Sequence, residues 1–395
     1  MWQSIAAVLI LITHQTADSG AEMFSYYVGM MSGTSLDAVD GVLVRFDAST
    51  GQLTRIAGYS LPLPTELRKL LTGLAHANQL TFKDLALAED GITRCYAECA
   101  KQVLEGIADD QQPVALGCHG QTIEHQPNST PPYTLQLLNP SLLAELTGHN
   151  VICDFRRRDL AAGGQAAPLV PAFHQAALQS KDEDRIIINL GGIANLTYLP
   201  ADQKTPVIGF DTGPANLLLD AWHQQHWQSD YDPSGRRASS GRVIPELLQQ
   251  LCSDEYFARQ PPKSTGREHF NPQWLATHLA VCNQQNLLPE DVLATLTELT
   301  ATTLADQIKY LDPVNLAHLL ICGGGWFNTF LVSRIRALSS PRKVTSTDTA
   351  GIPPQDMEAI AFAWLAHQHV NRQHGNLPSV TGAKGERVLG GFYPA

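Results

Sequence analysis

The sequence predicts an α/β protein that contains two similar domains, and three observations lead to this prediction. Short apolar runs, several of which end in glycine, alternate with longer segments whose apolar residues recur at helical spacing. One order of elements, three strands, a helix, a strand, a helix, a strand and a helix, occurs twice along the chain. The 395 residues, of which 44% are hydrophobic and 16% charged, are enough for about two domains.

The first half begins with a hairpin. Apolar runs at Tyr26–Met31 and Val39–Asp47 are separated by a turn rich in Gly, Ser and Thr, a pattern typical of two antiparallel strands. A third strand is expected at Leu53–Tyr59, and helices are expected at Pro64–Ala75 and Thr81–Glu105. The second helix carries apolar residues at helical spacing, so one of its faces should be buried.

Two short apolar runs follow at Pro113–Gly120 and Val151–Phe155, with a helix-like segment at 139–148 between them. Their brevity and their bounding glycines favour buried parallel strands. A helix is expected at Ala167–Gln179, because Pro168 lies near its start, where proline is tolerated. These elements complete the first set.

The second half repeats this order of elements. It begins with an apolar strand at Arg185–Gly192 that ends in glycines. Further strands are expected at 195–200, Pro206–Gly213, His318–Gly325 and Val344–Thr347, and helices at Ala215–His223, Val243–Cys252, Leu293–Tyr310 and from Pro354 to about His369. Ligands of α/β proteins bind at the carboxyl ends of strands and between domains, so we expect a binding cleft between the two halves.

The charge and the cysteine content exclude several kinds of partner. The chain has 27 basic and 38 acidic residues, a formal charge of −11 and no stretch rich in Lys and Arg, so we expect neither a nucleic acid nor a membrane as partner. The seven cysteines are an odd number without a CxxC pair, which argues against a disulfide framework and a structural zinc site. We therefore expect a cytoplasmic protein.

The first 22 residues contain an apolar run but do not have the pattern of an export signal. The run Ile5–Ile12 is too short to span a bilayer, and no Lys or Arg precedes Arg45. A strand pattern begins directly after Met23. We therefore interpret residues 1–22 as an N-terminal extension, with Met23 as an alternative start.

Three glycine-rich turns follow predicted strands and are candidates for nucleotide binding: GMMSGTSLDAVDG at 29–41, NLGGIAN at 189–195 and ICGGGWFN at 321–328. The first can present N–H groups and hydroxyls to phosphate, and its aspartates Asp37 and Asp40 can hold a hydrated Mg²⁺ ion. For this stretch alone, a hairpin turn of small residues is the favoured interpretation. None of the three is a P-loop, because the GxxxxGK[ST] lysine is missing. Three such turns at equivalent places fit a nucleotide held between two lobes.

Two further segments carry charged side chains beside glycines. Asp211 ends a predicted strand in GFDTGPAN, where a carboxylate can act as a general base or cap the next helix. Asp159 follows three arginines and precedes AAGGQ, and this segment is suited to a carboxylate ligand or to an internal ion pair. His119 in CHGQT is expected to be a structural or substrate-binding histidine, since no paired histidine accompanies it.

Over nearly the whole chain after Met23, the sequence resembles the anhydro-N-acetylmuramic acid kinase family. Seven segments in the family's order carry the resemblance: GMMSGTSLDAVDG, GCHGQTIEHQP, DFRRRDLAAGGQAAPLVPAFH, GFDTGPAN, PKSTGREHFN, ICGGGWFNTFL and IPPQDMEAIAFAWLA. The resemblance implies two duplicated actin-like ATPase (ribonuclease H-like) domains with a nucleotide and sugar cleft between them. Domain I would comprise residues 23–178 plus about 370–395, and domain II residues 183–369.

The family's activity would be an ATP- and Mg²⁺-dependent reaction on a small amino sugar. It opens the ring of 1,6-anhydro-N-acetylmuramic acid with water and phosphorylates O6, giving N-acetylmuramic acid 6-phosphate and ADP in cell-wall recycling. A homodimer is left open. Two alternatives remain: a nucleotide-dependent conformational ATPase of the actin or chaperone type, which shares the fold, and a kinase for a different sugar. The segment FRRRDLAAGGQ, Asp211 and Glu358 favour the sugar kinase.

The resemblance also assigns residues to roles. Asp211 would be the catalytic base, and Glu358 a second carboxylate near the attacking water. The residues expected to contact ATP are Gly33, Thr34, Ser35, Leu36, Asp37, Ala38, Val39, Asp40, Gly191, Gly192, Gly323, Gly324, Gly325 and Asn328, and Asp37 would bind Mg²⁺ through water. Those expected to contact the sugar are His119, Arg158, Asp159 and Gln165. At Ala38 the family usually has glycine, so the phosphate loop would be tightened if that backbone needs a positive φ.

Overall fold

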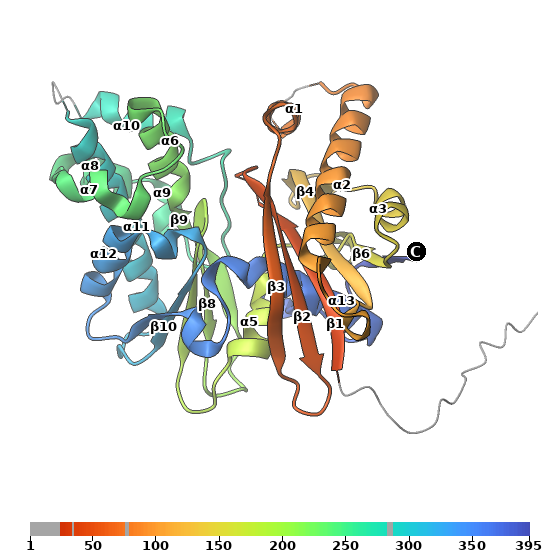
Figure 1. Ribbon diagram of the computed structural model, residues 1–395. Coiled ribbons are helices and arrows are strands. Elements are labelled where there is room, and N and C mark those ends of the chain that lie inside the picture. Colours follow the sequence, from red (N-terminus) through yellow and green to blue (C-terminus); the bar gives the residue numbers. More distant parts are fainter. Residues whose placement is uncertain (1–23, 34, 76–78, 283–286) are drawn as a thin grey trace, which may run out of the picture.

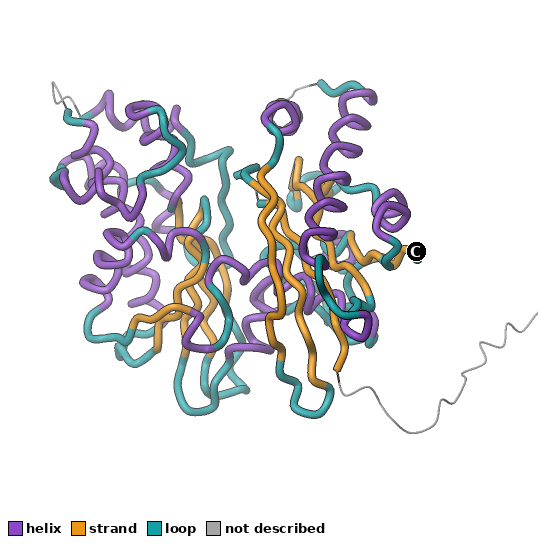
Figure 2. Tube along the Cα trace, viewed as in Figure 1, coloured by secondary structure: helices purple, strands orange, loops and turns teal. Residues whose placement is uncertain are grey.

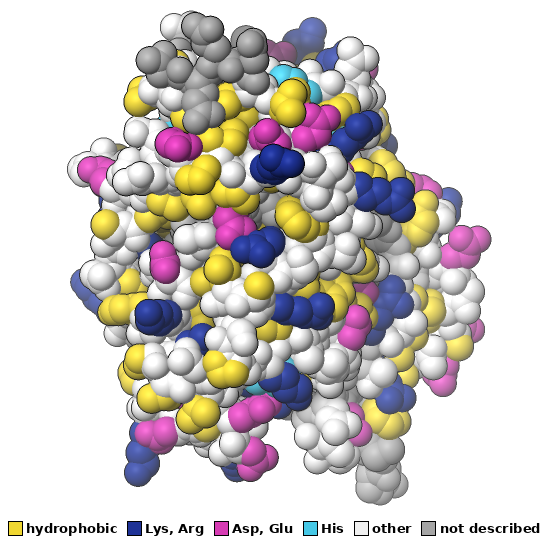
Figure 3. Space-filling view, turned by 90° about the vertical axis from the view of Figure 1, so that its left-hand side faces the viewer, with side chains coloured by type: hydrophobic (Ala, Val, Ile, Leu, Met, Phe, Trp, Pro, Cys, Tyr) yellow, Lys and Arg dark blue, Asp and Glu magenta, His cyan; other side chains and the backbone are white. Residues whose placement is uncertain are grey.

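The computed structural model describes residues 24–395 except 34, 76–78 and 283–286, so the expected extension at 1–22 lies outside the described residues. Two β-sheets stand next to each other, with helices packed between and around them (Figures 1 and 2). Within the described residues, no helix is long and apolar enough to cross a membrane. On the face shown in Figure 3, acidic and basic side chains are interspersed among neutral ones.

The first sheet is built from the first half of the chain and its last residues. Its strands are β1 (Phe24–Ser32), β2 (Ala38–Asp47), β3 (Leu53–Pro62), β4 (Ala115–Gln126), β5 (Tyr133–Leu137), β6 (Val151–Cys153) and β12 (Gly391–Tyr393). The strand order is β12-β6-β4-β1-β2-β3, and β5 pairs with β4. β1 and β2 form the expected antiparallel hairpin, while β4 is parallel to β1 and β6.

The second sheet has the same topology. Its strands are β7 (Arg185–Leu190), β8 (Ile193–Leu199), β9 (Ile208–Pro214), β10 (His318–Cys322) and β11 (Val344–Ser346). Their order, β11-β10-β7-β8-β9, matches β6-β4-β1-β2-β3 strand for strand: β10 lies beside β7 as β4 lies beside β1, and β11 lies beyond β10 as β6 lies beyond β4. The predicted α/β fold with a duplicated order of strands is therefore confirmed.

The helices cover both sheets. Those of the first half are α1 (Thr65–Ala75), α2 (Phe82–Leu104), α3 (Pro140–Thr147), α4 (Arg157–Ala161) and α5 (Val170–Leu178). Those of the second half are α6 (Asn216–Trp227), α7 (Arg236–Ser240), α8 (Pro245–Cys252), α9 (Glu255–Ala258), α10 (Pro272–Val281), α11 (Pro289–Leu311), α12 (Thr329–Ser339), α13 (Met357–Val370) and α14 (Pro378–Thr381). Short 3₁₀ turns are η1 (Asp109–Gln111), η2 (Pro233–Gly235), η3 (Gly324–Phe327), η4 (Thr347–Ala350) and η5 (Pro354–Asp356).

Two helices lie between the sheets, and each packs on the sheet of the other half. α13, from the second half, lies on β1 and β4, whereas α5, from the first half, contacts β8. The close approach of α13 requires glycine: a Cβ at Gly29 would lie 1.9 Å from the Ala359 carbonyl oxygen, and one at Gly117 2.2 Å from that of Phe362. One buried cluster accordingly joins Val42 of the first sheet to Ile187 of the second. The predicted division into residues 23–178 plus about 370–395 and residues 183–369 stays a prediction. It places α13 in the second domain, although this helix packs on the first sheet.

Candidate functional site

The hairpin turn between β1 and β2 is held by the neighbouring strand β4. Ser32 Oγ donates a hydrogen bond of 2.7 Å to Gln121 Oε1, and Gln121 Nε2 donates one of 3.3 Å to the Gly33 carbonyl oxygen. The Leu36 N–H group closes the turn onto the same carbonyl. Thr34 lies outside the described residues. The turn is thus fixed at the end of the sheet, where the sequence placed the phosphate loop.

Within this turn, the residue with a left-handed backbone is Leu36, at φ 59°, and not Ala38. Ala38 is the first residue of β2 and pairs with Pro62, so its backbone is extended and needs no glycine. Leu36 and Val39 are buried in the core, and only their main-chain atoms are left for a ligand. The backbone of Ala38 therefore does not have the positive φ that would have made alanine tighten the loop.

The carboxylate of Asp37 is exposed and faces the second half of the chain. Its side chain is 66% exposed and lies 3.7 Å from Arg68. Asp220 on α6 responds to its charge: burial, and then Asp37, Asp230 and Asp232, raise the pKa of Asp220 to about 7. No recognisable motif surrounds Asp220 in the sequence, so the sequence pattern alone does not mark it.

The glycines at the end of β7 hold the start of α6. The Gly191 carbonyl oxygen accepts a hydrogen bond from the Asn216 N–H group, and the Gly192 carbonyl oxygen accepts from Ala215 and Leu217. These carbonyl groups satisfy N–H groups that a helix start leaves without partners. The structure therefore gives both glycines a structural role, and their contact with a nucleotide stays a prediction.

Three glycines follow β10, and they differ in their surroundings. A Cβ at Gly323, where φ is 83°, would lie 2.4 Å from Asn189 Oδ1, and one at Gly325 would lie 2.5 Å from Leu190 Cβ. Both positions thus need glycine so that β10 can approach β7. Gly324 is exposed and has no atom within 4 Å of such a Cβ, so its backbone is open to a ligand.

Asn328, the last of the predicted nucleotide contacts, caps α12. Its side-chain oxygen accepts a 3.0 Å hydrogen bond from the Leu331 N–H group. A Cβ at Gly235 would lie 2.3 Å from the same oxygen, so the turn η2 packs closely against this cap. The geometry favours a structural role for Asn328 over the predicted contact with ATP.

Glu358, at the start of α13, lies near a partly buried arginine, Arg156, to which the resemblance gave no role. Asn189 Nδ2 donates a 3.4 Å hydrogen bond to Glu358 Oε1. Burial raises the pKa of Glu358, the charge of Arg156 lowers it and the charge of Asp40 raises it. Arg156 itself donates to His119 Nε2 over 2.9 Å and to the Ala166 carbonyl oxygen over 2.7 Å.

Of the three arginines in FRRRD, the structure therefore directs the first toward the predicted site. Arg157 and Arg158 are exposed on α4, whereas burial lowers the pKa of Arg156 to about 10. The resemblance selects Arg158, the third of them, whereas Arg156 is the residue directly before the start of α4. Binding of the sugar by Arg158 stays a prediction.

Asp159 is fully buried and joins distant segments of the chain. Its Oδ2 accepts a 2.8 Å hydrogen bond from the Ala166 N–H group, and its Oδ1 accepts from Asn376 Nδ2 at 2.7 Å and Thr381 Oγ1 at 2.8 Å. A carboxylate with 0% exposure and three such donors cannot touch a ligand without rearrangement. The geometry favours a structural role for Asp159 over the predicted contact with the sugar.

Asp211 lies within β9 and is covered by the segment that follows α9. Its Oδ2 accepts a 3.0 Å hydrogen bond from the Thr265 N–H group, and its own N–H group donates to the Lys263 carbonyl oxygen. Burial, together with the charge of Glu268, raises the pKa of Asp211 to about 7, although the Thr265 hydrogen bond opposes this. The residue at the cap position of α6 is Ala215, which makes no side-chain cap, so Asp211 is not the helix cap that was the alternative.

A cavity of about 460 Å³ adjoins this segment. Its walls come from both halves of the chain: Asn128, Gln165, Arg259, Gln260, Pro262, Lys263 and Ser264. Gln165 was predicted to bind the sugar, and Lys263 and Ser264 belong to the quoted motif PKSTGREHFN without having been given a role. The hydrogen bonds of Asp211, to the segment of Lys263 and Thr265, lie next to this cavity. Glu358 makes its hydrogen bond elsewhere, to Asn189.

The two sheets share one strand order, each carries a helix from the other half, and a cavity lies between the halves, so the fold is that of a duplicated α/β protein with a binding site between its two sheets. Comparison with known sequences gives the particular family. The sequence profile described as "Anhydro-N-acetylmuramic acid kinase" matches residues 25–395. The chain belongs to this family and is an enzyme of the kinase class.

Individual relatives agree with the family profile. The anhydro-N-acetylmuramic acid kinase of Coxiella burnetii (strain RSA 493 / Nine Mile phase I) is 46% identical over 368 residues, which are 93% of this chain and 97% of the relative. The protein of the same name from Chromohalobacter salexigens is 49% identical over 372 residues, 93% and 99% of the two chains.

Solved structures are similar at a lower level. A ROK family glucokinase from Streptomyces griseus in complex with glucose and AMPPNP is 14% identical with a TM-score of 0.39, covering 87% of this chain and 100% of that one. The activator of the 2-hydroxyisocaproyl-CoA dehydratase from Clostridium difficile with bound ADPNP is 14% identical with a TM-score of 0.43, covering 88% and 96%. No site assignment rests on these values.

Proposed function

We propose that this kinase opens 1,6-anhydro-N-acetylmuramic acid with water and transfers the γ-phosphoryl group of ATP to O6, with Asp211 as the base. The family and its relatives support the substrate and the class of reaction. The observation that carries the role of Asp211 is its position: a carboxylate held inside the protein with a pKa of about 7, beside a cavity between the two halves. A base with that pKa is well matched to proton transfer near neutral pH.

The chemistry of an anhydro sugar calls for such a base. The bridge oxygen O6 is bonded to C1, so no 6-hydroxyl exists from which a proton could be removed. Asp211 would instead take a proton from a water molecule as that water attacks C1. The C1–O6 bond breaks, O6 attacks the γ-phosphorus, and the bond to the leaving ADP oxygen breaks. The products are N-acetylmuramic acid 6-phosphate and ADP.

The surroundings of Asp211 suit this role. The Thr265 N–H group fixes Oδ2, which leaves Oδ1 as the oxygen for the water. Glu268 contributes negative charge nearby and so favours the protonated form once the proton has been taken. Glu358, near Arg156 and hydrogen-bonded to Asn189, is proposed as the second carboxylate near the sugar.

The nucleotide is proposed to bind with its phosphates at the β1–β2 turn and at Gly324. Bound Mg²⁺ would neutralise charge on the phosphate oxygens. The donor set fits an ion held through water: Asp37 is exposed, and its charge helps to raise the pKa of Asp220, so the two carboxylates create negative potential that a cation would relieve. Among the described residues, no group of three His, Cys, Asp or Glu side chains could hold a metal ion unaided.

The place of the reaction in the cell is also a proposal. A cytoplasmic enzyme that consumes an anhydro amino sugar would serve the recycling of cell-wall material. The alternative of a conformational ATPase is not favoured, because the family profile spans nearly all of the described chain. A kinase for a different sugar is tested by the choice of substrates.

The reaction in ¹⁸O-labelled water tests the mechanism. The label should appear at C1 only, while the unlabelled bridge oxygen stays on C6 beneath the new phosphate, as mass spectrometry of the product can locate. The Asp211→Asn enzyme should fold, bind ATP and lose turnover by roughly a hundredfold or more. Label in the phosphate ester, or ring opening that continues without ATP, would contradict a shared step and indicate a hydrolase followed by a separate kinase reaction.

A further inference from the structure

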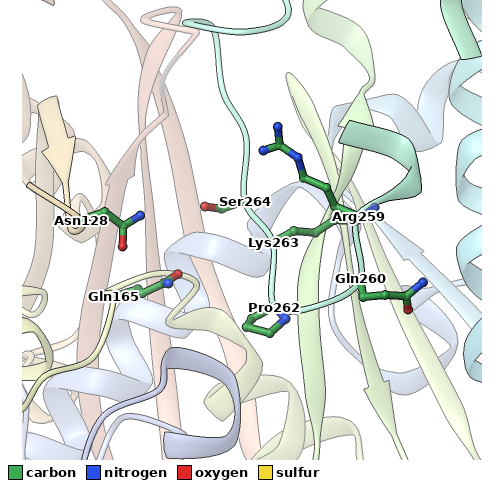
Figure 4. Close-up of a pocket in the computed structure, with 7 residues that line it drawn as sticks. All are labelled: Asn128, Gln165, Arg259, Gln260, Pro262, Lys263 and Ser264. Atoms are coloured by element: carbon green, nitrogen blue, oxygen red, sulfur yellow. The ribbon is translucent and has the colours of Figure 1, made fainter. Parts of the chain in front are cut away.

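The cavity between the two halves has polar walls of unequal charge. Asn128 and Gln165 line it on the side of the first half, and Arg259, Lys263 and Ser264 line it on the side of the second (Figure 4). The described residues that line it include two cations and no carboxylate. A site with this composition is suited to an anionic group that also accepts hydrogen bonds.

The two cations of this cavity have different partners. Lys263 is 8% exposed, and its ammonium group donates to the carbonyl oxygens of Tyr256 and Phe257 at 3.3 and 3.4 Å. The Lys263 ammonium group is therefore already hydrogen-bonded to carbonyl groups of α9. The Arg259 side chain is about half exposed and, in the view of Figure 4, rises from its backbone to end above Ser264.

Arg259 already pairs with Glu255 one helical turn away, but this contact leaves it available to a ligand. The Glu255 side chain is 82% exposed, and an exposed pair at this spacing is weak because water screens it. One guanidinium nitrogen makes the contact, whereas the group carries five N–H donors in a planar fork. A carboxylate can thus bind to the remaining donors or displace Glu255.

The same structural unit supports both Arg259 and the proposed base. Tyr256, in the helix that precedes Arg259, donates its hydroxyl to the Asp211 carbonyl oxygen over 2.8 Å. The Lys263 carbonyl oxygen and the Thr265 N–H group contact Asp211 from the segment that forms the cavity wall. A group bound by Arg259 would therefore be held by the same hydrogen-bonded segment that contacts Asp211.

We propose that Arg259 is the receptor for the carboxylate of the lactyl ether on the sugar, and that Ser264, Asn128 and Gln165 complete this polar subsite. This inference rests on the proposed function, whose substrate bears that carboxylate. It assigns the carboxylate to Arg259 in place of Arg158, which is exposed on α4 and does not line the cavity. Arg259 thereby determines specificity for N-acetylmuramic over N-acetylglucosamine derivatives.

The test compares Arg259→Gln with a matched control, Arg94→Gln. Arg94 pairs with Asp90 at the same helical spacing on the exposed face of α2. Steady-state kinetics are measured with 1,6-anhydro-N-acetylmuramic acid as substrate, and inhibition constants with its lactyl carboxamide and with 1,6-anhydro-N-acetylglucosamine, which lacks the lactyl group. Arg259→Gln should raise the KM for the acid about 10- to 100-fold and change kcat less than threefold. The inhibition constants of the two uncharged sugars should stay within about twofold.

Three results separate this proposal from the proposed function. If the wild-type enzyme does not phosphorylate the anhydro sugar at all, the proposed function fails. If the wild type is active and Arg259→Gln weakens all three sugars equally, or none of them, the carboxylate subsite is overturned while the function stands. A KM for the acid that rises with Arg158→Gln and not with Arg259→Gln would show that Arg158 on α4 binds the carboxylate. The Arg94→Gln enzyme should match the wild type throughout, and Arg259→Lys should give an intermediate KM, because lysine keeps the charge but not the planar fork.

Discussion

Arg156 donates a hydrogen bond from Nε to Nε2 of His119 over 2.9 Å, so a neutral, buried histidine orients a partly buried cation. The Gly120 carbonyl oxygen lies 2.7 Å from His119 Nδ1 and can only accept, which places the histidine proton on Nδ1 and leaves Nε2 as acceptor. Burial and the charge of Arg156 hold the pKa of His119 well below its usual value. His119 thus positions the arginine whose charge acts on Glu358, and its predicted contact with the sugar stays a prediction.

Replacing Arg156 by lysine should therefore lower kcat more than it raises KM. An ammonium group keeps the charge near Glu358, but it cannot reproduce the paired hydrogen bonds to His119 and Ala166. We expect kcat to fall about tenfold or more, and the free energy of unfolding to fall by about 1–3 kcal/mol. Steady-state kinetics and urea unfolding measure the two effects. Arg157→Lys, at the exposed neighbouring position, is the control; equal losses in both variants would contradict the positioning role.

Activity should depend on the ionisation of Asp211. With a pKa of about 7, the carboxyl group is protonated in mildly acidic solution and cannot accept a proton from water. We expect kcat/KM to rise with pH through about 7 and then to level off. The residual activity of Asp211→Asn should lack this rise. A wild-type profile that is flat between pH 5.5 and 8.5 would show that Asp211 is not the titrating base.

The same substitution should stabilise the protein at high pH. The pKa of Asp211 is raised from 3.8 to about 7 on folding, so its favourable contribution is complete below pH 4 and is lost as the pH rises through about 7. Asparagine carries no charge and can still accept from Thr265. Asp211→Asn should therefore exceed the wild type by about 1–4 kcal/mol at pH 8 and differ little near pH 4. Urea unfolding at both pH values measures this, and a loss of stability at pH 8 would refute the assignment.

Replacing Ala38 by glycine should bring no gain in ATP affinity. Ala38 is extended and paired with Pro62, so glycine relieves no strain there and adds backbone entropy to the unfolded chain. We expect the KM for ATP to change less than twofold and the free energy of unfolding to fall by about 0.5–1 kcal/mol. Kinetics at varied ATP concentration give the first value and chemical unfolding the second. A tenfold lower KM would indicate that the loop changes conformation on binding ATP.

Replacing Asp159 by asparagine should affect stability and not substrate binding. The amide NH₂ group would face a donor, either the Ala166 N–H group or the pair from Asn376 and Thr381. Such a mismatch in a fully buried position should cost about 2–4 kcal/mol of unfolding free energy. The KM for the sugar, measured at a temperature where the variant is folded, should stay within about threefold of the wild type. A large rise in KM with unchanged stability would restore the predicted contact with the sugar.

Much of the fold and of the site's location follows from local sequence patterns. Apolar runs followed by glycine-containing turns mark the strands β1, β4, β7 and β10. Burial of a strand requires apolar residues and close backbone approach requires glycine, and both requirements are visible within a few neighbouring residues. The repeated order of such runs gave the duplicated topology. β5 and β12 were not predicted, because neither is a continuously buried apolar run and both are defined by pairing with strands elsewhere in the chain.

The sequence by itself determined the fold class, the family and the segments that form the site, since each is encoded in residues close together along the chain. The tertiary structure decided what individual side chains do. Arg156 faces inward because His119, 37 positions earlier, accepts its hydrogen bond, and Asp159 is buried because Asn376, 217 positions later, donates to it. The exchange of α5 and α13 between the sheets depends likewise on the approach of distant segments. Such contacts leave no periodic signal, so only the folded chain could assign these roles.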